Sequence, residues 1–176
     1  MTGARNNVKG ILGLAIVLAA FVSAEASAQQ NMNVSATVPE VCVISNENTD
    51  LDMAFDLSSL ASATTDFEID VNFLWRCSQD NAATINISSG GGDGANGTTR
   101  YMTGPGGALL AYSISKPDNS AWGDGSNGQS GLGVTGQGMA NADEQTTVVT
   151  GTVTLSDAQA APVGSYSDTV QISLLP

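Results

Sequence analysis

The sequence predicts an all-β protein that folds as an antiparallel sandwich or barrel. After residue 30, apolar residues recur at every second position in several short runs, which is the period of a strand with one buried face. Segments rich in Gly, Asn, Asp and Ser separate these runs, and such residues favour turns. No helical period follows the first thirty residues, which argues against an α/β fold.

The clearest strand is predicted from residue 67 to residue 77. Its apolar side is Phe67, Ile69, Val71, Phe73, Trp75 and Cys77, and its polar side is Asp66, Glu68, Asp70, Asn72 and Arg76, with Leu74 as an exception. Cys77 is therefore expected to point into the core. Shorter alternating runs predict further strands at Leu51/Met53/Phe55/Leu57, Ile85/Ile87, Leu110/Tyr112/Ile114, Val149/Val153/Leu155 and Val170/Ile172/Leu174.

The first 28 residues resemble an export signal. Arg5 and Lys9 precede an apolar stretch from Ile11 to Val22, and residues 26–28 are small, as a signal peptidase requires. The apolar stretch is shorter than the roughly 20 residues of a membrane-spanning helix. We expect cleavage after residue 28 and an exported protein without membrane insertion.

The mature chain is strongly acidic. Residues 29–176 contain three basic residues against sixteen acidic ones, hence a net charge of −13. Nucleic acids and anionic membrane surfaces bind through basic patches, so neither is expected as a partner. A chain of this length suits one domain with one core.

Two cysteines, Cys42 and Cys77, lie in the exported part. An even number in an oxidising compartment predicts one disulfide, although two free buried thiols would also fit the sequence. Closing a loop of this size stabilises a fold by about 4 kcal/mol in the chain-entropy model.

The composition argues against an enzyme. The chain has no histidine and the mature part has one lysine, which excludes Ser-His-Asp and Cys-His nucleophile systems and imidazole zinc sites. Asp66, Glu68 and Asp70 could bind calcium or act as an acid-base pair, but the solvated face of a strand is the simpler interpretation. We expect no cofactor and no metal.

Two loop features have alternative interpretations. The Asp118–Gly125 stretch offers oxygen ligands but lacks the spacing of an EF-hand, so turn chemistry is favoured. Trp122 and Tyr101 could stack on a sugar, or could close the end of the sandwich. The glycine-dense stretches 88–97 and 123–138 are expected to be surface loops.

Three motifs carry a family resemblance. They are Gly164-Ser165-Tyr166-Ser167-Asp168-Thr169-Val170, then Arg100-Tyr101-Met102 with Ala111-Tyr112-Ser113-Ile114, and Trp122-Gly123-Asp124-Gly125. With them the mature chain resembles the spore coat protein U domain family, which includes the subunits of archaic chaperone-usher pili.

The resemblance implies an immunoglobulin-like antiparallel β-sandwich that is incomplete because its last strand is missing. A periplasmic chaperone would hold it open, an outer-membrane usher would export it, and a neighbouring subunit would complete it by donor-strand exchange. The terminal strand with Val170, Ile172 and Leu174 would then face the chaperone or the donor strand. The subunit would reach the cell surface as part of a fimbria, or be secreted, and would support adhesion or biofilm formation.

Residues 31–38 are predicted to be the donor strand. Met32, Val34, Ala36 and Val38 alternate with polar residues, and Pro39 ends the run because it cannot donate to a ladder. An ordinary first strand within the same sandwich remains possible. The expected organisation is a signal peptide at 1–28, a donor-strand extension at 29–39 and a pilin domain at 40–176.

Three functions compete at this point. A structural, polymerising pilin is favoured. A monomeric secreted coat or carbohydrate-binding sandwich is the first alternative, and a secreted hydrolase that uses the acidic strand face is the second.

Overall fold

The computed structural model describes residues 29–45, 51–92, 94–95, 99–126 and 129–176. The predicted signal peptide, residues 1–28, lies outside the described residues. Met1–Ala36 and Thr37–Pro176 are two separate units. The described part of the first unit, residues 29–36, is exposed and has no assigned helix or strand.

The second unit is built from eight strands among the described residues, with one short helix and two 3-10 turns. The strands are β1 (Cys42–Ile44), β2 (Phe67–Cys77), β3 (Ala82–Ile87), β4 (Arg100–Thr103), β5 (Leu109–Ser115), β6 (Leu132–Thr135), β7 (Gln145–Val153) and β8 (Ile172–Leu175). The turns are Pro105–Gly107 and Asn141–Asp143, and the helix is α1 (Leu155–Ala160). The all-β prediction is confirmed.

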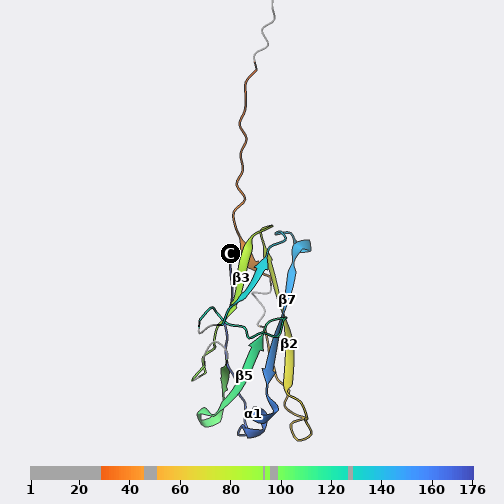
Figure 1. Cartoon of the computed structure of the whole chain (residues 1–176), viewed down its shortest axis with the longest axis vertical. Coiled ribbons are helices and arrows are strands. Elements are labelled where there is room, and N and C mark those ends of the chain that lie inside the picture. Colours follow the sequence, from red (N-terminus) through yellow and green to blue (C-terminus); the bar gives the residue numbers. More distant parts are fainter. Residues whose placement is uncertain (1–28, 46–50, 93, 96–98, 127–128) are drawn as a thin grey trace, which may run out of the picture. The chain divides into compact units, whose positions relative to one another are not determined.

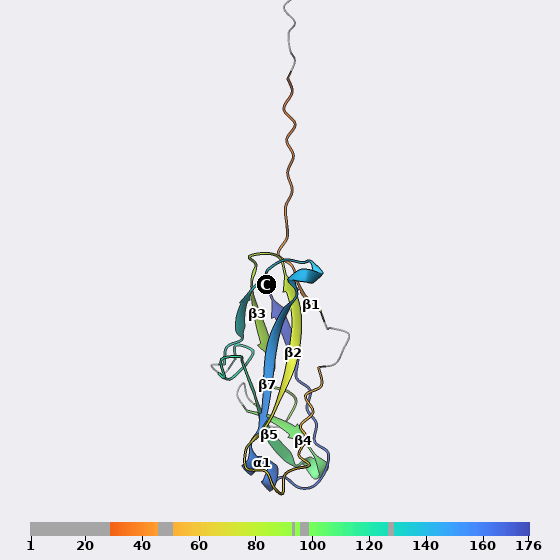
Figure 2. The ribbon, with the colours of Figure 1, turned by 90° about the vertical axis from the view of Figure 1, so that its right-hand side faces the viewer.

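The strands form two antiparallel sheets, so the fold is a sandwich. One sheet has the order β1-β2-β7-β5-β4 and the other the order β6-β3-β8. In Figure 2, β3 lies on one side of the β2–β7 pair and β1 lies on the other (Figures 1 and 2). The 3-stranded sheet covers the apolar face of the larger sheet, as the strand period requires.

The long strand β2 has the predicted two faces. Phe73, Trp75 and Cys77 are fully buried, whereas Glu68 and Asp70 are exposed. The buried Trp75 Nε1–H donates to Thr147 Oγ1 of β7 at 2.9 Å, so its polar atom is satisfied inside the core. Alternation alone therefore identified both the strand and its orientation.

Two predicted strands differ from the structure. Leu155 starts α1 instead of continuing β7, because Thr154 caps the helix by accepting a hydrogen bond from Asp157 N–H. Asp66 Oδ1 accepts a second bond from Leu155 N–H at 2.8 Å. Two side-chain acceptors at the first turn stabilise the helix more than burial of the single side chain of Leu155 would stabilise a longer strand.

The segment 51–57 alternates in burial as predicted but has no assigned strand. Its apolar side chains pack against the core, and Met53 and Phe55 lie over Gly151 of β7. A Cβ atom at Gly151 would stand 2.2 Å from Met53 Sδ and 3.0 Å from Phe55 Cζ. A glycine in a central strand commonly marks such a close approach.

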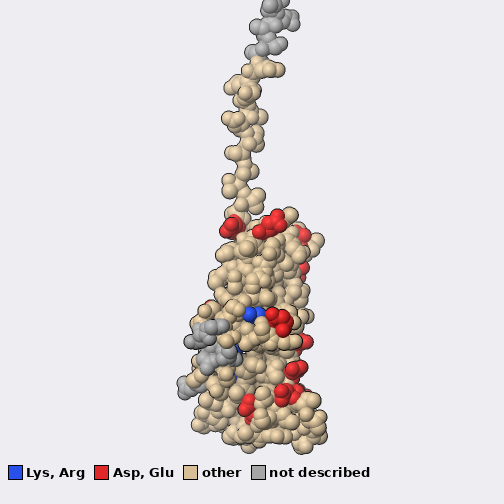
Figure 3. Space-filling model, viewed as in Figure 1, with Lys and Arg blue, Asp and Glu red and all other residues tan. Residues whose placement is uncertain are grey.

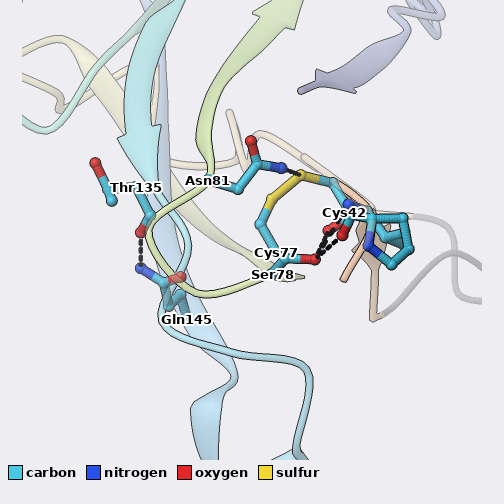
Figure 4. Close-up of a disulfide and its surroundings, with 8 residues drawn as sticks. Cys42, Cys77, Ser78, Asn81, Thr135 and Gln145 are labelled. Atoms are coloured by element: carbon cyan, nitrogen blue, oxygen red, sulfur yellow. Dashed lines mark hydrogen bonds between the residues drawn. A yellow bond between two sulfur atoms is a disulfide. The ribbon is translucent and has the colours of Figure 1, made fainter. Parts of the chain in front are cut away.

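The predicted disulfide joins Cys42 and Cys77 across β1 and β2 (Figure 4). The two residues are direct partners in the ladder. Ser45 N–H donates to Leu74 O and Ser78 N–H donates to Val41 O. Since hydrogen-bonded and non-hydrogen-bonded pairs alternate along an antiparallel ladder, these bonds assign Cys42–Cys77 to the second kind. It is therefore a non-hydrogen-bonded pair, whose side chains lie closest in an antiparallel ladder.

We predict that Cys42→Ser lowers the free energy of unfolding by about 4 kcal/mol, because the unfolded chain regains the entropy of a 35-residue loop. Urea unfolding measures the difference between the oxidised chain and the variant, both starting at residue 39 with residues 29–39, the predicted donor strand, appended after Pro176 so that the chains stay monomeric. Alkylation of both thiols in unreduced, denatured protein would contradict the bridge itself.

We further predict that Gly151→Ala destabilises the fold by about 1–3 kcal/mol, because the added methyl group collides with Met53. Gly133→Ala in β6 is the matched control, since its Cβ meets nothing within 4 Å. Met53→Ala in the Gly151→Ala background should recover part of the loss, as a double-mutant cycle measures. Equal effects at positions 133 and 151 would contradict the packing described.

Candidate functional site

The terminal strand β8 is paired on one side only. It forms the end of the 3-stranded sheet and pairs with β3, while no strand of the described chain pairs with its other edge. Such an edge is a template for pairing with another chain. We call it the β8 edge.

The amide and carbonyl groups on the unpaired side of β8 belong to the residues whose side chains point toward the core. Ser88 N–H donates to Gln171 O at 2.9 Å, whereas Ile87 N–H donates to Gly123 O, away from β8. Because hydrogen-bonded pairs alternate in an antiparallel ladder, the Ile87–Ile172 and Ile85–Leu174 pairs are not hydrogen-bonded. The amides and carbonyls of Ile172 and Leu174 therefore point to the open side.

The strand β1 ends the other sheet in the same way. It pairs only with β2 among the described strands, and the alternation leaves the backbone groups of Cys42 and Ile44 on its open side. Cα atoms of β1 and β8 approach within 8 Å of one another. Two strands with unpaired edges therefore lie near each other at the rim of the sandwich.

The predicted terminal residues come together on the β8 edge. Val170, Ile172 and Leu174 are all half-buried and pack against the core, and Val170 lies just before the assigned strand. Their burial is lower than that of Ile85 and Ile87 of β3, which are fully buried. The apolar side of this edge is thus only partly covered by the chain itself.

The segment before β8 is fixed by bonds that sequence reasoning missed. Ser167 and Thr103 exchange two backbone hydrogen bonds. Asp168 Oδ2 accepts from Tyr112 O–H at 2.7 Å, and Oδ1 accepts from Gly91 N–H at 2.8 Å. The motif at 164–170 carried the family resemblance, but only the fold reveals which groups it meets.

Tyr112 lies beside a buried cation. Arg100 is fully buried and donates to the carbonyl oxygens of Ser88, Ile87 and Trp122 at 2.9–3.1 Å. Burial lowers the pKa of the Arg100 guanidinium. Burial, with a further contribution from the hydrogen bond to Asp168, raises the pKa of Tyr112 above its usual range, so the phenol stays protonated at neutral pH and donates its hydrogen bond to Asp168.

The glycine-dense stretches are only in part the expected surface loops. Gly91 N–H donates to Asp168, and we call the Asp168 carboxylate with its partners Gly91 and Tyr112 the Asp168 cradle. Residues 132–135 form β6. Two alternating apolar residues, Leu132 and Val134, were too weak a pattern among glycines to predict that strand.

Two of the three carboxylates considered for chemistry have structural partners, and the third, Glu68, is exposed. Asp66 caps α1, and Asp70 Oδ1 accepts from Thr150 Oγ1 at 2.6 Å. Hydrogen bonds from Ser120 and Ser126 lower the pKa of Asp118 and of Asp124 respectively, which agrees with turn chemistry. The described residues contain no cluster of three or more side chains placed to hold a metal.

Trp122 does not form a sugar-binding platform. Its side chain is fully buried, and Nε1–H donates to Ile85 O at 2.9 Å. Tyr101 is half-buried. The tryptophan therefore closes the core, and the stacking interpretation is wrong for that residue.

The exposed surface carries mainly negative charge (Figure 3). Arg100 and Lys116 are buried, and Lys116 Nζ donates to Ser130 Oγ at 3.0 Å. Arg76 donates to Met139 O and Asn141 Oδ1. Arg76, Arg100 and Lys116 thus donate to neutral oxygens, so none of these hydrogen bonds goes to a carboxylate. None of the described helices is long or apolar enough to cross a membrane.

The four apolar residues predicted to donate a strand lie outside any assigned strand. Met32, Val34 and Val38 are each 84% exposed, and Ala36 is exposed as well. Exposed apolar side chains at strand period are compatible with either use of this segment, so its role stays a prediction.

Among solved structures, the chain is similar to one from the archaic Csu pili of Acinetobacter baumannii, a pre-assembly complex of the chaperone CsuC and the tip adhesion subunit CsuE. The TM-score is 0.51 with 22% identity over 79% of this chain, which spans 40% of the matched chain. This likeness confirms the fold class, an immunoglobulin-like sandwich. A chaperone-usher pilus studied for rod uncoiling matches at a TM-score of 0.44 and 17% identity, over 85% of this chain and 96% of that one.

A search of curated proteins gives no match. The model of the Spore Coat Protein U domain matches residues 28–173, which is most of the chain and includes the Asp168 cradle, both cysteines and the first two residues of β8. The protein therefore belongs to the Spore Coat Protein U domain family.

Proposed function

We propose that the chain is a structural subunit of a chaperone-usher surface fibre, polymerised by strand donation. Residues 31–38 of one copy would pair with the β8 edge of the next. The observation that carries this proposal is the terminal strand whose unpaired backbone groups belong to Ile172 and Leu174. A donated strand would bond to these groups and extend the 3-stranded sheet.

The pattern of the extension fits such a position. Met32, Val34, Ala36 and Val38 would present one apolar face to the half-buried Val170, Ile172 and Leu174, and each large aliphatic side chain buried would contribute about 1.5–3 kcal/mol. The intervening polar residues would face solvent. Pro39 would separate the donated strand from the chain's own β1.

The segment 51–57 supports the same interpretation. Its side chains alternate between half-buried and exposed, yet no strand is assigned to it. An alternating segment without a ladder is expected where a neighbouring strand is still to be supplied. A subunit in this state would expose unpaired edges, which promote aggregation.

A periplasmic chaperone would therefore cover the β8 edge before assembly, and an outer-membrane usher would receive the subunit. Export to the cell surface, with adhesion or biofilm formation as the result, follows from this proposal. Family membership supports it. A monomeric coat protein would use the same sandwich without polymerising, and a hydrolase would need the acidic face of β2, whose Asp66 and Asp70 have structural partners.

We predict that an appended donor strand completes the fold in one chain. In a mature chain that starts at residue 39, residues 29–39 are added after Pro176 through a flexible linker. This chain should be monomeric and unfold cooperatively, because the β8 edge is paired and the apolar residues are covered. Light scattering after size-exclusion chromatography and urea unfolding measure this.

The matched control carries Val34→Asp in the appended segment. A carboxylate among apolar side chains costs several kcal/mol, so this chain should aggregate as the uncomplemented one does. If the uncomplemented mature chain is itself a stable two-state monomer, or if the Val34→Asp segment complements equally well, strand donation is wrong.

We also predict that deletion of residues 29–38 in the native setting uncouples acceptance from donation. The truncated subunit should still bind its chaperone and accept a strand, yet it should not extend a fibre from its own amino terminus. Copurification with the chaperone and electron microscopy of fibres measure the two steps. Normal fibres, or a truncated subunit that no longer folds with its chaperone, would contradict the assignment.

A further inference from the structure

The register of β8 is only partly specified by its own side chains. The strand reads Ile172-Ser173-Leu174-Leu175, so a shift by one residue would replace the inward Leu174 with an equally apolar Leu175, and only the exchange of Ile172 for Ser173 opposes it within the strand. Because the side-chain period is two, such a shift turns every residue of the strand to the opposite face. It would also exchange the backbone groups on the open side, so another part of the fold has to fix the register.

The cradle of Asp168 lies four residues before β8 and holds the chain at one side chain. Its carboxylate accepts three hydrogen bonds, from Tyr112 O–H at 2.7 Å, from Gly91 N–H at 2.8 Å and from Thr169 N–H at 2.8 Å. Tyr112 belongs to β5 in the other sheet and is 8% exposed. The carboxylate therefore ties the terminal segment to a rigid part of the core.

The backbone of Gly90 lies so close to the Asp168 carboxylate that no side chain fits at position 90. Gly90 adopts a φ of +84°, and a Cβ atom there would stand 2.1 Å from Asp168 Oδ2. A glycine permits both this conformation and this approach. Shifting the segment by one residue would bring Ser167 or Thr169 to the cradle, and a single hydroxyl cannot replace a carboxylate that accepts three bonds.

Between the cradle and β8, one further contact continues the same register. Ser88 N–H donates to Gln171 O at 2.9 Å, and Gln171 N–H donates to Ser88 Oγ at 2.8 Å. These backbone bonds follow the register but do not select it, because another residue's backbone could replace Gln171. Within residues 168–171, Asp168 supplies the polar side-chain contact with the core, whereas Val170 supplies apolar packing.

We propose that Asp168 is a positioning residue that sets the register of β8. It thereby directs the side chains of Ile172 and Leu174 inward and their backbone groups toward an incoming strand. The inference rests on the proposed function for its biological meaning, since the positioned edge is the one that would accept the donor. The register itself is a property of this chain and can be measured without any donor.

The test uses single cysteines at neighbouring positions of β8. Leu174→Cys and Leu175→Cys are each introduced into the chain with the appended donor strand, and a maleimide is added under native, non-reducing conditions so that the Cys42–Cys77 bridge stays closed. With Asp168 present, the thiol at 175 should react faster than that at 174 by on the order of tenfold, because only the former faces solvent. Intact mass confirms a single label.

Asp168→Ala should abolish or reverse this contrast while circular dichroism and cooperative unfolding persist. Asp70→Ala is the matched control, since it also removes a carboxylate that binds a hydroxyl of a neighbouring strand, and it should leave the contrast unchanged. If Asp168→Ala does not fold, Asp168→Asn is used, because an amide oxygen cannot accept all three bonds.

A wild-type contrast in the folded Asp168 variant, or an equal loss in Asp70→Ala, overturns the proposal. Its failure is distinguishable from failure of the proposed function. If the appended strand does not complement the chain at all, strand donation is wrong, and the same labelling in the chain lacking residues 29–38 still decides the role of Asp168.

Discussion

The structure depends on a strand that is bonded on one side only. An unpaired backbone amide or carbonyl that becomes buried costs free energy comparable to a lost hydrogen bond, and β8 leaves the groups of Ile172 and Leu174 unpaired on its open side, beside half-buried apolar side chains. The half-burial of its side chains, the unpaired edge of β1 and the unassigned segment 51–57 all accompany this one deficiency. Under the proposed function, a second chain that supplied a strand would remove the deficiency, and the fold would then be linked directly to assembly.

Local patterns in the sequence predicted the parts of the fold that local physics controls. The alternation of β2 identified its buried face, and the two exported cysteines predicted the bridge. Predictions were wrong where a distant partner decides the outcome. Residues 51–57 alternate like a strand but have no assigned ladder, while Leu155 fits the strand period but begins a capped helix. The cradle of Asp168 joins residues 77 positions apart in the case of Gly91, a distance over which composition and periodicity carry no information.

The distribution of charge also follows from the fold rather than from composition. Arg100 ties β4 to the end of β3 and to Trp122 through three carbonyl oxygens, and Lys116 is buried beside Ser130. Because these cations serve the interior, the exposed surface keeps most of the acidic residues without counter-charges. Like-charged surfaces repel one another in a salt-dependent way, so contact between copies through these faces is disfavoured and contact through an uncharged strand edge is not.

The position of the disulfide has a mechanical consequence. Cys42 comes three residues after Pro39, at the point where the extension enters β1, and its partner Cys77 ends the longest strand of the larger sheet. Tension applied to the extension reaches the covalent bridge within a few residues and passes through it to Cys77 and the chain that follows β2. The 34 residues enclosed between the two cysteines are thereby bypassed, so stretching cannot draw the loop containing residues 51–57 out of the subunit. The bridge thus limits how far a loaded subunit lengthens, whatever the strength of the non-covalent contacts around it.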